Sequence, residues 1–378
     1  MKRKIIEVST DTNIGGAGKC LIALLENFDY SKFAVKVILP PDSLLKSHIE
    51  LLGIEVIEVP GIAEKSLDIK SIHSLKKIFK AEKPDLVHTH ASMSARIAAR
   101  HAGAKVVYTR HSVFPPSKYL TSFPGRQING MFNNYYSDGI IAVAEAAKDN
   151  LTDTGVDASK IRVILNGVAG LKPVDKAEKQ RIRDRFAIPD GDKVISIVAR
   201  LEDIKGHDYF IEAASMLLRD GIKAKFMIAG TGSYESQLKA KVKRLGLEKD
   251  IIFTGFISDV DKLMSITDIQ VNASYGTEAT SLALLEGMSI GVPAVVSDFG
   301  GNPGVIKNGE NGFVVTKQNS AALKTAIKKL LDDEALYASM SERSREIFKT
   351  VFTAETMTRN TENLYSEILE RGEQNGKR

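Results

Sequence analysis

Short runs of β-branched and other apolar residues alternate along the chain with longer segments whose apolar residues recur at helical spacing. Apolar runs of four to eight residues bounded by turn residues are typical of buried strands, whereas a period of three to four residues indicates an amphipathic helix. The pattern predicts seven strands in the first half, at residues 5–8, 34–39, 54–58, 86–89, 106–109, 140–143 and 162–165. Six more are predicted at residues 194–199, 225–229, 251–254, 269–272, 294–297 and 312–315.

This alternation pauses between residues 166 and 192, where glycines and prolines surround a charged stretch. We place the interdomain linker at 171–192, between an amino-terminal domain at 1–170 and a carboxyl-terminal domain at 193–350. Residues 351–378 are expected to form a C-terminal helix and a polar tail. Because strands and helices alternate, the strands pair in parallel and helices cover both faces of each sheet. The sequence thus predicts an α/β protein of two doubly wound domains that bind ligands in the cleft between them.

Composition narrows the class of protein. With 43% apolar and 26% charged residues, the chain resembles ordinary soluble globular proteins. No apolar stretch approaches the roughly 20 residues of a membrane-spanning helix. A single cysteine, Cys20, provides neither a disulfide framework nor a cysteine-based zinc site, so we expect a cytoplasmic protein.

The positive charge is concentrated in the first half of the chain. Residues 1–170 hold 22 Lys and Arg against 17 Asp and Glu, whereas the remainder holds 30 of each. This balance suits anionic small substrates or an anionic membrane surface, although an ordinary solvated surface can show the same imbalance. It does not suit nucleic acid, because the cations form no long basic stripe.

A glycine-rich turn follows the first predicted strand. It satisfies neither the Walker loop, because Asn13 and Cys20 occupy required positions, nor the dinucleotide fingerprint, which needs glycine where Leu21 stands. What remains is the pair Gly15 and Gly16 at a helix start, where backbone amides can approach an anion. The turn therefore either faces a phosphate or is simply a tight connection.

Three histidines stand at the ends of two neighbouring predicted strands: His88, His90 and His111. A metal site is disfavoured, because the chain has one thiol and no His-Glu-x-x-His spacing, and we expect no metal cofactor. Polar residues at the carboxyl ends of strands line the cleft, so hydrogen bonding to a ligand is the better interpretation. For His88 we favour a buried, internally bonded side chain.

Six of the 25 aromatic residues lie between positions 114 and 136, together with Lys118 and Arg126. Aromatic rings and basic tips are both favourable at lipid headgroups, so this segment could make peripheral membrane contact. It could equally belong to a core.

Most of the candidate ligand-binding residues lie in the second domain. Arg200 and Lys205 follow the strand at 194–199, where two cations beside helix amides suit a diphosphate. After the strand at 269–272, Thr280 or Ser281 is the natural helix cap, and the helix start presents free amides to a phosphate. Glu286, deeper in that helix, can accept hydrogen bonds from ribose hydroxyls. An ordinary capped helix is the alternative.

At these residues the sequence resembles the retaining glycosyltransferases of family 4 (group 1). Members of that family have the GT-B fold of two facing Rossmann-like domains. The resemblance covers nearly the whole chain, and its most specific element is the pair Glu278 and Glu286 followed by Gly291-Val292-Pro293. Other matching segments are Gly15-Gly16, His88-Thr89-His90, Thr109-x-His111, Asn166-Gly167-Val168, Arg200 with Lys205-Gly206, and Gly300-Gly301.

The resemblance implies roles for individual residues. Arg200, Lys205, the amides of Thr280, Ser281 and Leu282, and the Gly15-Gly16 loop would bind the donor diphosphate, and Glu286 would hold the ribose. The catalytic residues would be Glu278, near the transferred sugar, and His111, in contact with it. Ala279-Thr280-Ser281 stands where the family often has Gly-Phe-Gly, which leaves the donor sugar open.

The expected function is a metal-independent hexosyltransferase. It would move sugar from a nucleotide diphosphate sugar, a UDP-sugar, to a glycan or lipid-linked acceptor in surface polysaccharide synthesis, at the inner face of the membrane. Cations and helix amides would stabilise the leaving phosphates. Two alternatives share the fold: an isomerase resembling nucleotide-sugar 2-epimerases, and a noncatalytic protein that binds nucleotide sugars.

Overall fold

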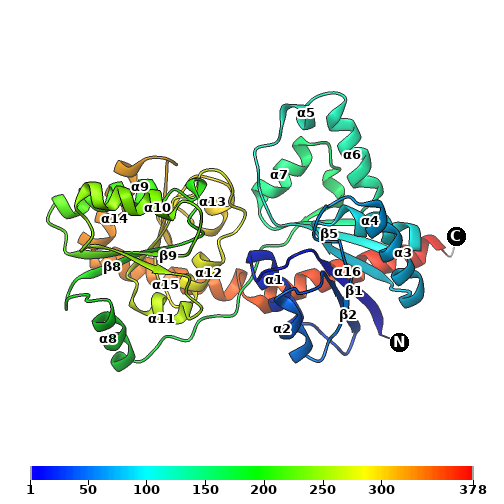
Figure 1. Ribbon diagram of the computed structural model, residues 1–378, viewed down its shortest axis with the longest axis horizontal. Helices are drawn as coiled ribbons and strands as arrows, with labels where there is room; N and C mark the ends of the chain where they lie inside the picture. Colours follow the sequence, from blue (N-terminus) through cyan, green and yellow to red (C-terminus); the bar gives the residue numbers. More distant parts are fainter. Residues whose placement is uncertain (1, 377–378) are drawn as a thin grey trace. The chain divides into compact units, whose positions relative to one another are not determined.

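The computed structural model describes residues 2–376. These residues form two compact units (Figure 1). The first unit comprises residues up to Gly167 together with the segment from Ala354 onward, and the second comprises Val168–Thr353. The last two residues of the expected polar tail lie outside the described residues. No helix among residues 2–376 has the length and apolar character required to cross a bilayer.

All thirteen predicted strands are present and pair in parallel, which confirms the α/β prediction. The strands of the first unit are β1 (Arg3–Ser9), β2 (Phe33–Leu39), β3 (Glu55–Glu58), β4 (Leu86–His90), β5 (Lys105–Arg110), β6 (Gly139–Ala142) and β7 (Ile161–Val163). Those of the second are β8 (Lys193–Val198), β9 (Ala224–Ala229), β10 (Ile251–Gly255), β11 (Ile269–Asn272), β12 (Ala294–Ser297) and β13 (Gly312–Val315).

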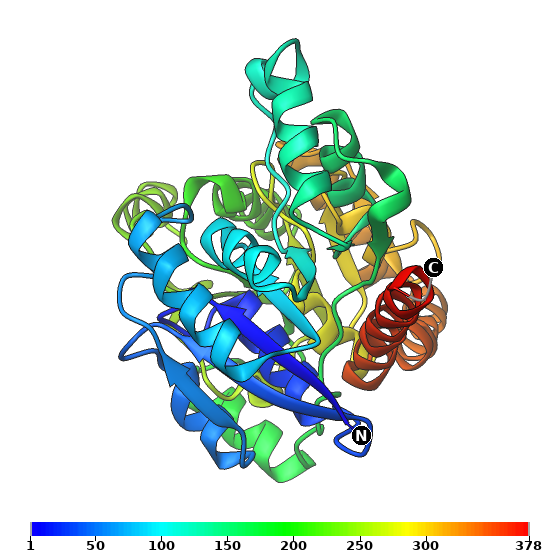
Figure 2. The same cartoon turned by 90° about the vertical axis from the view of Figure 1, so that its right-hand side faces the viewer.

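Helices separate most of the strands and flank both faces of each sheet (Figures 1 and 2). In the first unit they are α1 (Gly16–Glu26), α2 (Leu45–Leu51), α3 (Ile69–Glu82), α4 (Met93–Ala102), α5 (Lys118–Thr121), α6 (Gly125–Tyr135), α7 (Glu145–Asp153), η1 (Ala158–Lys160) and α16 (Ala354–Gly376). In the second they are α8 (Lys176–Arg185), η2 (Asp203–Lys205), α9 (His207–Arg219), α10 (Glu235–Leu245), α11 (Val260–Ile266), α12 (Leu282–Ser289), α13 (Asn302–Val305), α14 (Ser320–Asp332) and α15 (Glu334–Val351).

Central strands are apolar on both sides because helices cover both faces of the sheet. In β9, Phe226 and Ile228 belong to the core beneath α9 and α14, whereas Met227 and Ala229 pack toward α8 and α11. The same division occurs in the first unit between the core under α3 and α4 and the core under α1 and α2. Buried strands of this kind appear in sequence as nearly continuous apolar runs, which makes them recognisable.

The strand order places a topological switch point in each sheet. The first sheet runs β3-β2-β1-β4-β5-β6-β7, and the second runs β10-β9-β8-β11-β12-β13. In both, the order reverses at the first strand of the unit, between β1 and β4 and between β8 and β11. Ligands of open parallel sheets bind beyond the carboxyl ends of the strands at this point.

Two segments differ from the sequence expectation. Residues 171–192, expected as a linker, contain α8, and Ile182 and Ile188 are buried in the core of the second unit. The amphipathic face of α8 is short, and its many charges conceal it in sequence. The final helix α16 belongs by its contacts to the first unit, although the chain reaches it from the second.

Candidate functional site

The residues predicted to bind the donor stand at the switch point of the second sheet. Arg200 and Lys205 follow β8, and Glu278 and α12 follow β11, the strand paired with β8. Parallel pairing brings the two carboxyl ends together, so residues far apart in sequence become neighbours.

Lys205 and Glu278 form a largely buried ion pair. Nζ of Lys205 lies 3.1 Å from Oε2 of Glu278, and it also donates to the carbonyl oxygen of Thr277 at 2.9 Å. The two side chains are 12% and 9% exposed. The short contact between the two buried side chains fixes their relative geometry.

Buried polar side chains form hydrogen bonds with the carboxylate of Glu278. Its Oε2 accepts hydrogen bonds from Oγ of Ser274 at 3.0 Å and from Nδ2 of Asn272 at 3.2 Å. Ser297 and Asn302 extend this network, since the Ser297 hydroxyl donates to the Ser274 carbonyl and receives a bond from the Asn302 amide. The carboxylate is therefore held in one orientation before any ligand arrives.

The helix α12 begins as the sequence indicated. Ser281 is the N-cap, and its hydroxyl accepts from the backbone N–H of Leu284. The amides of Leu282 and Ala283 belong to the first turn, whose N–H groups have no partner inside the helix. Glu286 lies four residues after Leu282, on the same face, and is half-buried.

Arg200 has a different environment from Lys205. Its side chain is 73% exposed, and it forms a surface ion pair in which Nη1 lies 3.0 Å from Oε1 of Glu202. The backbone beneath it is fixed, because Leu201 donates to the carbonyl of Thr231 and Tyr234 donates back to Leu201. The guanidinium can therefore move toward a ligand while its backbone stays in place.

Two glycines permit the close approach of the backbones that carry this site. A Cβ atom at Gly206 would lie 2.1 Å from the carbonyl oxygen of Ala273, and one at Gly300 would lie 2.0 Å from that of Glu278. Both glycines also have positive φ angles, 73° and 60°, which other residues rarely adopt. The loop after β11 therefore packs closely against the backbone at Gly206 on one side and at Gly300 on the other.

In the first unit, Gly15 and Gly16 form an exposed turn at the start of α1. Gly15 is the N-cap with φ of −86° and ψ of −170°, and it has no side chain to satisfy the first amides. No protein atom lies within 4 Å of a Cβ built at either glycine. Neither strain nor crowding inside the protein therefore requires glycine at these positions.

His111 lies at the end of a chain of hydrogen bonds that crosses three strands. Nε2 of His111 is 2.7 Å from Nδ1 of His90, and Nε2 of His90 is 3.1 Å from Oε2 of Glu7. Glu7 is in β1, His90 ends β4, and His111 follows β5, so the switch point of the first sheet gathers all three. The rings of His90 and His111 are stacked, with centroids 5.1 Å apart.

Glu7 is fully buried yet ionised. Burial would raise its pKa, but the electrostatic interactions and hydrogen bonds with His88 and His90 outweigh it and lower the pKa to about 2. Tyr365 of α16 donates to Oε1 at 2.8 Å, and Nδ1 of His88 lies 2.9 Å from Oε2. His88 is also bonded to Thr109, so it is the internally satisfied histidine that the sequence suggested. Burial, followed by the neighbouring His90 and His88, lowers the pKa of His111 well below its usual value.

Glu7, His88 and His90 are also grouped closely enough to be considered as metal ligands, since their donor atoms lie within 4.8 Å of one another. Every one of the facing atoms is, however, already joined to another member of the group by a hydrogen bond of 2.9 to 3.1 Å. The donor set is satisfied by protons, and we interpret it as a hydrogen-bond network.

The aromatic segment at 114–136 forms α5, α6 and their connections, which project from the sheet of the first unit (Figures 1 and 2). Four of its six aromatic residues are exposed, so the core interpretation is wrong for them; Phe123 is 82% exposed. Phe132 packs inward, where Arg96 lies over its ring. On α6, Ile128, Met131 and Tyr135 are exposed on one face of the helix.

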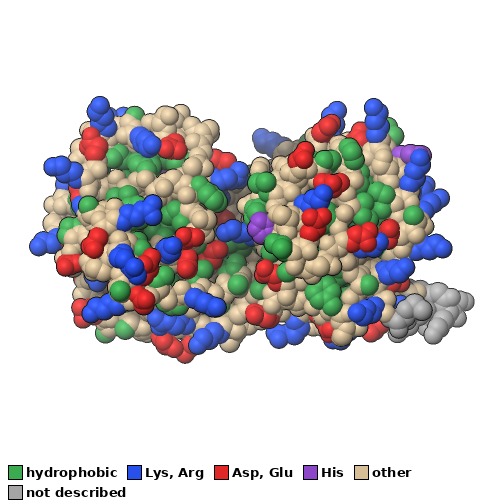
Figure 3. Space-filling model, turned by 60° about the horizontal axis from the view of Figure 1, so that its bottom comes forward, with side chains coloured by type: hydrophobic (Ala, Val, Ile, Leu, Met, Phe, Trp, Pro, Cys, Tyr) green, Lys and Arg blue, Asp and Glu red, His purple; other side chains and the backbone are tan. Residues whose placement is uncertain are grey.

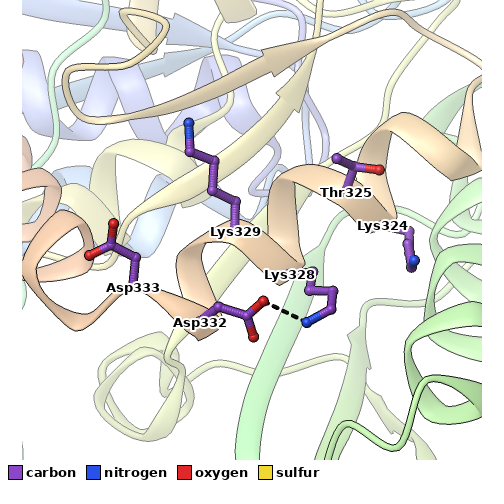
Figure 4. Close-up of a pocket in the computed structure, with 6 residues that line it drawn as sticks. All are labelled: Lys324, Thr325, Lys328, Lys329, Asp332 and Asp333. Atoms are coloured by element: carbon purple, nitrogen blue, oxygen red, sulfur yellow. Dashed lines mark hydrogen bonds and ion pairs between the residues drawn. The ribbon is translucent and has the colours of Figure 1, made fainter.

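A shallow hollow of about 330 Å³ lies along α14, away from every predicted residue (Figure 4). Its lining combines three lysines, two aspartates and one threonine, and Lys328 is paired with Asp332 at 2.5 Å. Lys324 is paired with Asp220 in the same way. Charges of both signs are likewise mixed over the face of the molecule in Figure 3. The hollow therefore provides no concentrated positive field.

Sequence reasoning missed Glu7 and the residues around Glu278, namely Asn272, Ser274, Ser297 and Asn302. A signal existed for Glu7, because an acidic residue interrupts the buried run Ile5, Ile6 and Val8 of a central strand. Asn272 and Ser297 are the final residues of β11 and β12, the strand ends at which polar side chains point to a site. Tyr365 carried no such signal.

Two family models match the chain, "Glycosyltransferase Family 4" over residues 14–169 and "Glycosyl transferases group 1" over residues 178–347. The chain is 31% identical over 287 residues to the Escherichia coli UDP-Gal:alpha-D-GlcNAc-diphosphoundecaprenol alpha-1,3-galactosyltransferase, covering 71% of this chain and 72% of the relative. It is 29% identical over 286 residues to EpsD of Bacillus subtilis, covering 72% and 74%. The solved structure of Anabaena HepE in complex with UDP matches with a TM-score of 0.84 at 22% identity, covering 97% and 100% of the two chains.

Proposed function

The chain belongs to the group 1 glycosyltransferases of family 4, with the GT-B fold, and we propose that it transfers a sugar from a UDP-sugar to a glycan or glycolipid acceptor with retention of configuration. The observation that carries this proposal is the buried pair of Lys205 and Glu278 at the switch point of the second sheet, beside the start of α12. A cation and first-turn amides suit a diphosphate, and a fixed carboxylate suits the sugar attached to it.

The choice of a UDP-sugar is supported by the relatives. The Escherichia coli relative is named for the use of UDP-Gal, and HepE was solved with UDP and with UDP-glucose. UDP-galactose is an α-linked donor and that relative is named as an alpha-1,3-galactosyltransferase, which is the outcome of retention. Its acceptor is a diphosphoundecaprenol-linked sugar, so a lipid-linked acceptor in surface polysaccharide synthesis is the class we propose for this chain.

In the proposed reaction the bond between the anomeric carbon and the β-phosphate oxygen breaks, and its electron pair stays on that oxygen. The acceptor hydroxyl oxygen bonds to the anomeric carbon from the same face and its proton passes to the leaving phosphate. Arg200, Lys205 and the amides of Thr280 to Leu282 stabilise the growing negative charge. Glu286 holds the ribose, and Glu278 and His111 contact the transferred sugar.

The Gly15-Gly16 turn is proposed to contribute amides to the same phosphates. Its open surroundings support this role, because a ligand oxygen can approach a backbone that has no Cβ atom. With two cations and two sets of amides available, we propose that transfer needs no metal cofactor. Activity that survives dialysis against a chelator would support this, whereas loss of activity restored by Mg²⁺ or Mn²⁺ would refute it.

The direct test is an array of UDP-sugars and acceptors read by mass spectrometry. Transfer predicts a product heavier than its acceptor by one sugar residue, with the anomeric configuration of the donor by NMR. Donor alone should give at most slow hydrolysis to UDP. A new nucleotide sugar formed from donor alone would indicate an isomerase, and UDP binding without turnover with any acceptor would indicate a binding protein.

We also propose that the first unit rests on the inner face of a membrane to reach a lipid-linked acceptor. The α5–α6 surface, defined as Phe123, Ile128, Met131, Tyr135 and the cations Lys118 and Arg126, combines exposed apolar side chains with positive charge. From residue 86 to residue 137 the chain contains six Lys and Arg and no Asp or Glu. Exposed apolar and aromatic side chains with basic neighbours are the combination that binds anionic lipid headgroups.

A further inference from the structure

The hydrogen bonds around Glu7 determine where the ring protons of the histidines lie. An ionised carboxylate can only accept, and Glu7 faces three potential donors: Tyr365, His88 and His90. Each facing nitrogen of the two histidines must therefore carry a proton. A consistent arrangement follows in which Nδ1 of His88 and Nε2 of His90 are protonated.

Nδ1 of His88 also lies 2.6 Å from the hydroxyl oxygen of Tyr365, which can accept from it while the hydroxyl proton goes to Glu7. With its proton on Nδ1, His88 accepts at Nε2 from the hydroxyl of Thr109, 2.6 Å away. If this is the only proton on the His90 ring, Nδ1 presents a lone pair. The only atom facing that lone pair within hydrogen-bond distance among the described residues is Nε2 of His111, at 2.7 Å.

His111 must then donate from Nε2, which leaves Nδ1 as the unprotonated nitrogen of its ring. Resting on the proposed function, we propose that Glu7 and His90 are positioning residues that hold His111 as a neutral hydrogen-bond acceptor for a hydroxyl group of the transferred sugar. The carboxylate acts through His90 and touches no substrate itself.

The hydrogen bonds from His111 through His90 to Glu7, called the relay below, leave His111 in a form that suits sugar transfer. As the anomeric bond breaks, positive charge grows on the donor sugar. A neutral nitrogen lone pair directed at a sugar hydroxyl is compatible with that charge, whereas an imidazolium would oppose it. The lowered pKa of His111 agrees with the neutral form. Asp11, in the loop after β1, also interacts electrostatically with His90.

The tautomer can be measured without any assay of transfer. In protein labelled with ¹⁵N at histidine, we expect His111 to carry its proton on Nε2, with Nδ1 showing the chemical shift of an unprotonated nitrogen. A proton on Nδ1 of His111 in the unmodified protein would overturn the proposal whether or not the chain transfers sugar. So would a stoichiometric metal ion in the purified protein, because it would replace the protons of the network.

Two isosteric variants of His90 separate a positioning role from a structural one. His90→Gln places an amide where Nε2 stands, so it keeps the contact with Glu7 but leaves His111 without its acceptor. His90→Asn places an amide oxygen where Nδ1 stands, so it can still accept from His111. We expect His90→Gln to give mixed tautomers of His111 and to lower kcat on the order of 10-fold, as outer-shell partners of histidine typically do, with the KM for donor unchanged.

His90→Asn should retain the Nε2-protonated His111 and recover most of the lost kcat. Equal kcat in the two variants with an unaltered His111 tautomer would show that His90 is merely structural. If neither variant folds, the measurement on the unmodified protein still decides the question. If neither the unmodified protein nor the variants transfer sugar but the tautomer is as expected, the proposed function fails and the relay stands.

Discussion

Nζ of Lys205 lies 3.1 Å from Oε2 of Glu278 in a pair that is largely buried. The cation proposed to bind the donor diphosphate is thus already compensated by the carboxylate proposed to lie beside the sugar. Removing one partner of such a pair leaves the other uncompensated, which typically costs about 3 to 5 kcal/mol. Substitutions of the two residues should therefore have different consequences for binding, catalysis and stability.

Glu278→Gln should lower the rate of transfer about 100-fold, the order lost with one electrostatic group in a preorganised site. The affinity for UDP should stay the same or rise, because Lys205 no longer shares its charge with a carboxylate. Isothermal titration with UDP and initial-rate measurements separate the two effects. Glu235→Gln, which breaks the exposed pair with Lys239 in the same unit, is the control and should change neither quantity.

Glu286→Ala should have the complementary effect, a weaker affinity for UDP, because it removes the proposed partner of the ribose hydroxyls. UDP affinities that fall equally in Glu278→Gln and Glu286→Ala would contradict the division of roles between the two glutamates.

Arg200 and Lys205 should differ in their effect on stability although both are proposed to bind phosphate. Arg200→Ala should raise the KM for donor and leave the Tm nearly unchanged, since exposed ion pairs contribute about 0 to 1 kcal/mol. Lys205→Ala should raise the KM and also lower the Tm, because the buried Glu278 loses its partner. Scanning calorimetry measures the difference, and Lys239→Ala is a control for a lysine in an exposed pair. A Tm loss in Arg200→Ala as large as that in Lys205→Ala would refute this account.

The fold and the second switch point were predictable because their signals are local. The central strands are short apolar runs, most of them rich in β-branched residues, and Arg200, Lys205 and Ser281 follow strands at the positions where a doubly wound sheet binds its ligands. The docking of α16 was not predictable, because the bond between Tyr365 and Glu7 joins residues 358 positions apart and depends on tertiary packing. The start of the second unit, at residue 168, was also missed. The segment before β8 resembles a linker because α8 is highly charged and buries only Ile182 in the core.

Gly15→Ala and Gly16→Ala should fold normally and lose activity. Neither added Cβ meets a protein atom within 4 Å, and at Gly16, inside α1, alanine is favoured over glycine by about 0.5 to 1 kcal/mol. A methyl group there would instead obstruct the approach of a phosphate to the amides, so the KM for donor should rise. Gly18→Ala is the contrasting variant, because its Cβ would lie 2.8 Å from the side chain of Leu45 and should lower the Tm. Full activity in both turn variants would exclude the turn from the donor site.

Acid should destabilise the first unit in two steps. The pKa values of His88 and His111 are lowered in the folded state, so the unfolded chain binds more protons than the folded one as the pH falls below 6.5. The pKa of Glu7 is lowered from 4.5 to about 2, so a second loss of stability follows below pH 4.5.

Hydrogen exchange of the β1 and β4 amides at about pH 7 and about pH 5 measures the first step. His111→Asn should reduce the pH dependence over this range, whereas the exposed control His73→Asn should not. A first unit that becomes more stable as the pH falls from about 7 to about 5 would show that these histidines do not have lowered pKa values in the folded state.

The α5–α6 surface should bind anionic vesicles through both its charge and its apolar residues. Each cation near such a surface contributes about 1 kcal/mol, so Lys118→Gln with Arg126→Gln should weaken binding roughly 30-fold. Phe123→Glu with Met131→Glu should weaken it at least as much, because both side chains are more than half exposed. Sedimentation with phosphatidylcholine vesicles, with and without phosphatidylglycerol, measures the loss.

Leu51→Glu, at an 86% exposed position of α2, is the matched control and should bind as the unmodified chain does. UDP affinity should be unchanged in every variant, and equal binding to neutral and anionic vesicles would show that the charge of this surface does not recognise lipid.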